Sequence, residues 1–137
     1  MVIVTVFIIH WYLAIFTHAL FYHRYAAHGM WHMSKFWERV FYVLAFIVHG
    51  SSYLSANAYG IMHRLHHEHV DTEEDPHAPK YSGNILGFMV KTRNNYINIF
   101  HGKTALDAKY TENLPSWPAF EKFAHNWITR VAWIVLY

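Results

Sequence analysis

The chain has 137 residues, a length that fits one domain, and it carries a net charge of +2 with 54% hydrophobic and only 15% charged residues. About a quarter of the residues are charged in a typical soluble domain, so the composition favours a membrane protein. No basic run indicates nucleic-acid binding, and the lack of cysteine excludes disulfides, iron–sulfur clusters and thiol nucleophiles.

A transmembrane helix is expected at the start of the chain. Residues 2–22 contain no Asp, Glu, Lys or Arg, and about 20 apolar residues are enough to cross a bilayer. A cleaved signal peptide is the alternative, but its basic start and small-residue cleavage site are not visible. Arg24, Lys35 and Arg39 follow the segment closely, so the positive-inside rule places residue 23 onward in the cytoplasm.

Two histidine clusters stand out among the 13 histidines of the chain. The first reads His23-Arg24-Tyr25-Ala26-Ala27-His28, and the second reads His63-Arg64-Leu65-His66-His67. Neutral imidazole is the commonest side-chain ligand for iron, zinc and copper. The two clusters therefore predict a metal site at the membrane surface.

The two clusters differ in their expected geometry. On a helix, His63, His66 and His67 lie on one face because they are three and four residues apart. His23 and His28 lie roughly 140° apart around a regular helix, so they converge only if the helix ends or distorts there. Gly29 is well placed to end it. His18 and His32 offer alternative pairings.

A second uncharged stretch, residues 40–62, separates the clusters. If this stretch crossed the bilayer once, it would leave the clusters on opposite faces. We therefore expect it to lie in the interface, to re-enter, or to form a buried helix under a cytoplasmic cap.

The remaining sequence looks like a cytoplasmic cap followed by another apolar segment. Pro, Gly, Asn and charged residues are frequent in residues 68–118, with one or two short helices expected within residues 85–100. Residues 119–137 become apolar at their end and predict the start of a further membrane helix. The expected organisation is one all-α domain over residues 1–137, with residues 1–22 in the membrane and residues 23–118 cytoplasmic or interfacial.

The clusters resemble the first two histidine boxes of the membrane-bound fatty acid desaturases of the Δ9 type. The first box of that family has the form H-R-x-x-x-H. The second has the form H-R-x-H-H followed by D-T-x-x-D-P-H, and it is matched by residues 63–77, from His63 to His77. The spacing of about 40 residues between the boxes is also similar. The resemblance covers residues 2 to about 80 well and the remainder weakly.

The resemblance implies a helical membrane fold and an oxidoreductase that uses O2 and two electrons to introduce a cis double bond into a fatty acyl chain. It implies two non-haem irons held by histidine alone, an acyl-CoA or acyl-lipid substrate, and an external donor of the cytochrome b5 or ferredoxin type. By this resemblance the metal ligands are His23, His28, His63, His66 and His67.

Further roles are expected around these ligands. Asp71, Asp75 and His77 are candidate partners that orient the ligand rings, although a solvated acidic loop is an equal reading of the two carboxylates. His49 and Gly50 fall between the boxes and are candidates for the wall of an acyl channel.

The sequence also departs from the family. It has no third histidine box, so the resemblance predicts an incomplete desaturase domain whose activity alone is doubtful. Alternatives are a related hydroxylase, ketolase or alkane monooxygenase, and a non-catalytic membrane protein that binds zinc.

Overall fold

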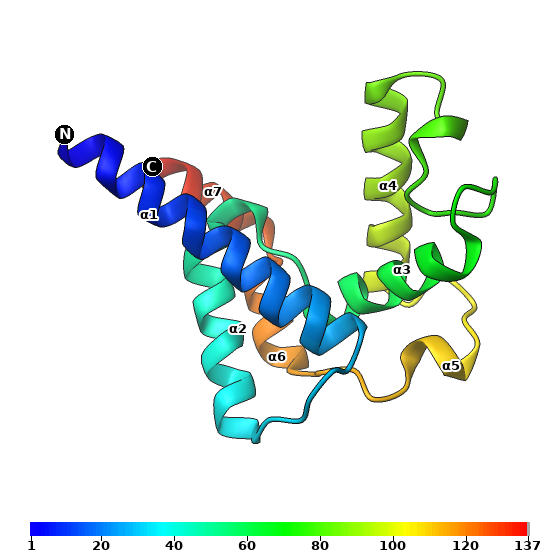
Figure 1. Ribbon diagram of the computed structural model, residues 1–137, viewed down its shortest axis with the longest axis horizontal. Coiled ribbons are helices and arrows are strands. Elements are labelled where there is room, and N and C mark those ends of the chain that lie inside the picture. Colours follow the sequence, from blue (N-terminus) through cyan, green and yellow to red (C-terminus); the bar gives the residue numbers. More distant parts are fainter. Residues whose placement is uncertain (137) are drawn as a thin grey trace.

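The computed structural model describes residues 1–136, and this part of the chain is built from helices without any strand (Figure 1). The expectation of an all-helical fold is therefore confirmed for these residues. The elements in chain order are α1 (Val2–Thr17), η1 (His18–Ala27), α2 (Lys35–His49), η2 (Gly50–Ser52), α3 (Ala56–His69), η3 (Pro79–Tyr81), α4 (Ile85–Phe100), α5 (Ala108–Thr111), α6 (Pro118–Ala124) and α7 (Trp127–Leu136).

The first two elements form one continuous helix of 26 residues, Val2–Ala27. It is long and apolar enough to cross a membrane, by length and composition. Only 6% of its apolar window is buried inside the protein, so it is not the core helix of a soluble domain. The helix continues past residue 22, where the sequence placed the end of the membrane segment, and its last ten residues are a π-helix.

The uncharged stretch between the clusters is a broken pair of helices. Helix α2 ends at Gly50, which adopts a φ of 52°. The Ser55 hydroxyl accepts a hydrogen bond from the Ala58 N–H and caps the start of α3. The axis bends by 76° between the two halves. This bend excludes a single straight crossing and returns α3 to the end of η1.

Helix α3 crosses η1 at close range. A Cβ atom on Gly60 would lie 2.6 Å from Leu114 Cδ2 and 3.2 Å from the Ala26 carbonyl oxygen. Only glycine therefore permits this approach without a shift of the neighbouring chain. The crossing brings the second histidine cluster beside the first.

Residues 68–118 fold as the loops, short helices and single long helix α4 that follow α3. Helix α4 covers the whole of the segment in which one or two short helices were expected, and it packs against α3. Helix α7 is a short apolar helix whose residues Val135 and Leu136 are exposed. The last residue of the expected final segment, 137, lies outside the described residues.

A buried carboxylate holds the start of α3. The Glu121 side chain on α6 accepts hydrogen bonds from the hydroxyls of Ser55 (2.8 Å) and Tyr42 (3.3 Å). It also accepts bonds from the backbone N–H groups of Ala56 and Asn57, and burial raises its pKa despite these bonds. Since α-helices begin with unpaired N–H groups, Glu121 satisfies donors that would otherwise be buried without a partner.

We expect Glu121→Ala to destabilise the fold because it leaves several buried donors unpaired. The expected loss in the free energy of unfolding is about 1–3 kcal/mol, the cost of leaving a buried hydrogen-bonding group without its partner. Thermal unfolding followed by circular dichroism in detergent measures it. Glu112→Ala, which removes an exposed carboxylate, is the matched control. Equal unfolding midpoints for the two variants would contradict the assigned role.

His125 joins α6 to α4. Its ring stacks on Phe100 with centroids 4.0 Å apart, and its Nε2 lies 3.0 Å from the Tyr96 hydroxyl. Burial, together with the nearby Arg130 and His101, lowers the pKa of His125 to about 4. The folded protein therefore holds this imidazole neutral at pH values where an unfolded chain would protonate it.

This lowered pKa predicts a loss of stability in acid. Between pH 6.5 and about 4 the unfolded state binds the extra proton, so the free energy of unfolding falls as the pH falls. His125→Gln keeps a hydrogen-bonding side chain beside Tyr96 but cannot titrate. We expect its unfolding midpoint to drop less than that of the parent between pH 7.5 and pH 5.5, and an equal drop would show that other groups control the acid sensitivity.

Candidate metal centre

The π-helix aligns the two histidines of the first cluster. In η1 the backbone hydrogen bonds run to the fifth residue back, as between the His28 N–H and the His23 carbonyl (3.1 Å). Residues five apart therefore come onto nearly the same face, which a regular α-helix forbids. The helix then stops at Gly29, which adopts a φ of 58°. The first cluster was expected to converge only if its helix distorts or ends there, and the structure shows both a π-helix and an end at Gly29.

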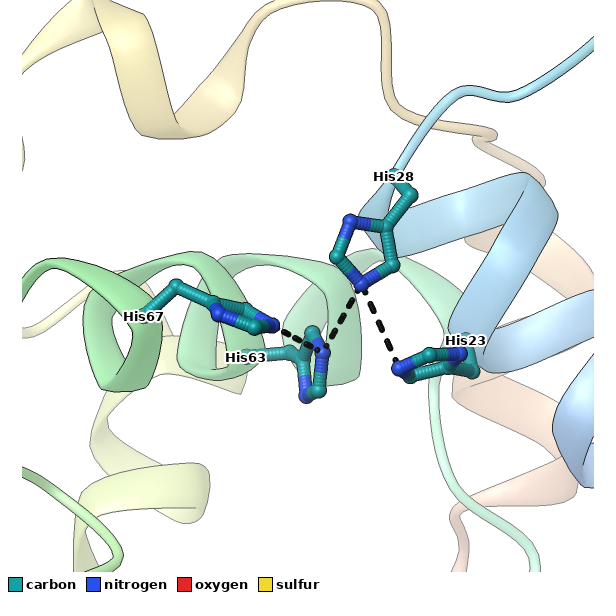
Figure 2. Close-up of side chains that lie close together, drawn as sticks. All are labelled: His23, His28, His63 and His67. Atoms are coloured by element: carbon teal, nitrogen blue, oxygen red, sulfur yellow. Dashed lines mark hydrogen bonds between the residues drawn. The ribbon is translucent and has the colours of Figure 1, made fainter. Parts of the chain in front are cut away.

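The second cluster contributes from α3. His63 and His67 are one turn apart, and their rings point from α3 toward those of His23 and His28 (Figure 2). The successive Nε2 atoms of His23, His28, His63 and His67 lie 3.2, 3.2 and 3.0 Å apart. One ligand nitrogen from each residue lies within 4.8 Å of all the others.

These contacts fit a shared cation better than a hydrogen-bond chain. Each Nε2 carries either one hydrogen or one lone pair, yet the Nε2 atoms of His28 and His63 each make two short contacts. A metal at the centre would accept all four lone pairs. Tetrahedral ligands at about 2.05 Å from a metal are about 3.3 Å apart, close to the spacing of the neighbouring nitrogens.

The site favours neutral imidazole. Burial lowers the pKa of His63 to about 3, with further contributions from its four neighbouring histidines. Burial also lowers the pKa of His28, together with His23, His67 and Arg64. No Asp or Glu belongs to this group of four, so a bound cation would keep its full charge. His28 and His67 are exposed, which leaves the group open to ions from solvent.

Arg64 fixes the relative position of the two clusters. Its Nε donates to the Ala27 carbonyl (2.8 Å), and its Nη2 donates to the Ala26 carbonyl (3.4 Å). Its Nη1 donates to the carbonyls of Glu112 (2.8 Å) and Tyr110 (3.2 Å). The sequence reasoning missed this role, although an arginine directly after the first histidine of the second cluster was the available signal.

His66 lies outside the group of four. Its Nδ1 lies 2.9 and 3.0 Å from the two carboxylate oxygens of Asp75, which is fully buried. This contact fixes the hydrogen on Nδ1 and leaves the lone pair of Nε2 for another partner. Burial acts to raise the pKa of Asp75, but hydrogen bonds from His66 and from two backbone N–H groups outweigh it and leave the pKa lowered.

The other two candidate partners act differently from Asp75. Asp71 supplies only its backbone, donating its N–H to Asp75 Oδ2 (3.2 Å) and accepting a bond from the Tyr81 hydroxyl (2.9 Å), while its side chain is exposed. His77 donates its backbone N–H to Asp75 Oδ1 (2.8 Å), and its ring lies 5.9 Å from that of His66. Both residues therefore help to hold the carboxylate that holds His66.

A cavity of about 730 Å³ lies beside the cluster. His63 and His66 line it together with His18, His77 and His125. The apolar part of its wall is formed by Leu54, Met62, Phe88, Met89, Ile97 and Trp127. His49 and Gly50 are not part of this wall, and their role in an acyl channel stays a prediction. The His49 ring instead lies against Tyr22 and His18.

Comparison with known proteins finds no matching family model, no matching curated protein and no matching solved structure. The chain thus combines a group of four imidazoles, a carboxylate-bound His66 and a cavity lined by His63 and His66.

We expect the group of four to bind a divalent cation. Co²⁺ is a suitable probe because its visible absorption reports four-coordinate geometry. His63→Ala should weaken binding by more than the roughly 10–100-fold that loss of an outer hydrogen-bond partner costs. His69→Ala, on the same helix but outside the group, should bind Co²⁺ as the parent does. Equal affinities of all three proteins would exclude a metal site here.

Proposed function

We propose that this protein is an O2-dependent fatty acyl desaturase that introduces a cis double bond into an acyl chain. The observation that carries the proposal is the meeting of the two motifs: four imidazoles from segments 35 to 44 residues apart converge within 4.8 Å. The continuation of the second motif, with Asp75 and His77 around His66, favours this reaction over a histidine-box hydroxylase or ketolase.

The cavity supports an acyl substrate. Its volume of about 730 Å³ falls in the range of small-molecule sites, about 300–1,000 Å³. Its wall combines apolar side chains with the imidazoles of His63 and His66. A methylene group of an acyl chain cannot form hydrogen bonds. The shape of the cavity wall must therefore position it.

The first helix supports a membrane location. Its 26 residues span about 39 Å at 1.5 Å per residue, which exceeds the hydrocarbon core of about 30 Å. Its apolar residues are exposed, for example Ile3 at 85% and Phe7 at 67%. We propose an integral membrane protein whose histidine clusters face the cytoplasm, because Arg24, Lys35 and Arg39 follow the helix.

Two irons are the proposed cofactors. The group of four fits one metal by donor type and spacing, and His66, which lines the cavity beside it, is the proposed ligand of a second. Further donors or water would complete both coordination shells. Bound iron would supply the oxygen activation that an unactivated C–H bond requires. An external electron donor of the cytochrome b5 or ferredoxin type would supply two electrons.

The residues of this chain have separable tasks in that reaction. Arg64 keeps the two clusters in register, and Asp75 contacts Nδ1 of His66 and orients its ring. The neutral histidines provide strong ligands without competing protons. The apolar side chains of the cavity wall would contact the acyl chain.

A zinc-binding role is the second candidate function. Four nitrogen ligands in a compact group match the closed four-coordinate shell of structural zinc sites. A non-catalytic protein would need no cavity at the site, and the shared wall at His63 is the observation that favours the enzyme.

Product analysis tests the proposed function. The protein as its gene encodes it would be produced in a host deficient in desaturation, and its fatty acids analysed by gas chromatography and mass spectrometry. We expect a new cis-monoene, its loss in His67→Ala, and its retention in His69→Ala. Metal analysis of the purified protein should find iron.

Other products would redirect the assignment. A hydroxylated or oxidised acyl chain would replace the desaturase with a hydroxylase or ketolase. Zinc at full occupancy, with no iron and no new product, would establish the zinc-binding protein instead.

A further inference from the structure

A chain of aromatic rings leads away from the metal centre. The ring of His63 stacks on Tyr59 with centroids 5.6 Å apart and planes within 12°. Tyr59 contacts Tyr22 at 5.5 Å. Tyr59 also lines the cavity beside the group of four, whereas Tyr22 is completely buried and has no part in the metal or substrate binding proposed above.

The series of aromatic rings continues through the core to the surface. Phe21 lies 5.5 Å from Tyr22 and stacks on Tyr25 at 5.8 Å. Tyr25 stacks on Trp31 at 6.3 Å. Tyr22 and Phe21 are completely buried, whereas Trp31 is partly exposed. Closely spaced tyrosine and tryptophan rings pass single electrons readily. Between Tyr22 and Tyr25 the series is bridged by the packed ring of Phe21.

Tyr25 has a proton acceptor that Tyr22 lacks. The Tyr25 hydroxyl donates to Glu38 Oε2 at 2.6 Å, and the carboxylate is 3% exposed. The Lys35 Nζ donates a hydrogen bond to the other carboxylate oxygen of Glu38 at 2.8 Å, which leaves Oε2 to the Tyr25 hydroxyl. The Tyr22 hydroxyl donates to the Leu54 carbonyl, which cannot take up a proton. A phenol gives up an electron easily only when its proton can leave as well, so an oxidising equivalent would come to rest on Tyr25.

We propose that Tyr59, Tyr22, Tyr25 and Trp31 form a relay that carries oxidising equivalents from the metal centre to the surface. The proposal rests on the proposed function, because an O2-dependent iron centre is the one-electron oxidant. Such a centre damages its own ligands if it is oxidised when no acyl chain is in place, and a relay gives it a harmless source of electrons.

The electrons and protons of the step balance. The Tyr25 phenol would lose one electron by way of Tyr22 and Tyr59 to an iron centre held by the histidines, which would be reduced by that electron. The phenolic O–H bond breaks, its proton moves to Glu38 Oε2, and a neutral phenoxyl radical remains. An external one-electron reductant, such as a thiol, then returns an electron through Trp31. Glu38 returns the proton and restores the phenol.

A branch of the same series of rings, which leads to Tyr42, is less suitable as the site of a radical. Phe21 also lies 5.1 Å from Tyr42, whose hydroxyl is 3.3 Å from Glu121. This hydrogen bond is longer than that of Tyr25, and the Glu121 carboxylate already accepts bonds from Ser55 and two backbone groups. The geometry therefore favours Tyr25 as the site of the radical.

A light-generated oxidant tests the relay without iron or O2. The chain has no cysteine, so His67→Cys provides one attachment point, beside His63, for a ruthenium photosensitiser. After a flash in the presence of an electron acceptor, transient absorption should show a neutral tyrosyl radical. We expect this signal to be lost in Tyr25→Phe and to form more slowly in Glu38→Gln.

Tyr12→Phe is the matched control, because Tyr12 lies on the same continuous helix but is 64% exposed and away from the relay. It should leave the signal unchanged, and circular dichroism should confirm that all variants are folded. The same yield and rate of radical in the parent, Tyr25→Phe and Glu38→Gln would overturn the relay. Because this measurement needs no iron, its failure is separate from a failure of the metal and product analyses that test the desaturase.

Discussion

The crossing of η1 and α3 is the contact on which the candidate site depends. The two helices approach so closely at Gly60 that a methyl group there would collide with Leu114 and crowd the Ala26 carbonyl. Arg64 then ties α3 to the end of η1 through the carbonyls of Ala26 and Ala27. Two segments that are distant in sequence thereby present their imidazoles to one point, and any change that separates the helices would disperse the four nitrogens.

Helix α3, which carries two of the four imidazoles, is held at its start and near its middle. Glu121 satisfies the N–H groups at its start, and Arg64 fixes its middle. A metal ligand is most effective on a rigid element whose own position is determined by packing and hydrogen bonds. Glu121 and Arg64 therefore set the position of α3, which in turn sets the positions of His63 and His67.

The histidines divide into two kinds of environment along α3. His63 and His67 meet other imidazoles and have no carboxylate in their group, whereas the His66 ring contacts the buried Asp75 and lines the cavity. One turn of α3 thus carries two of the four imidazoles of the group and a separate, oriented histidine beside the cavity. The aromatic rings that begin at Tyr59 connect the same turn to the interior of the molecule and to Trp31.

The sequence alone determined the features that arise from local periodicity. The uncharged run predicts the long apolar helix, the spacing of His63 and His67 places them on one helical face, and Gly29 ends the helix that carries His23. Only the tertiary structure decided that this helix becomes a π-helix, which aligns His23 with His28, that α2 and α3 bend by 76°, and that Asp75 rather than Asp71 binds His66. Local pattern fixes where a side chain lies around its own helix. The pairing of His66 with Asp75, the register set by Arg64 and the close approach at Gly60 depend on the packing of segments far apart in the chain, which no local spacing specifies.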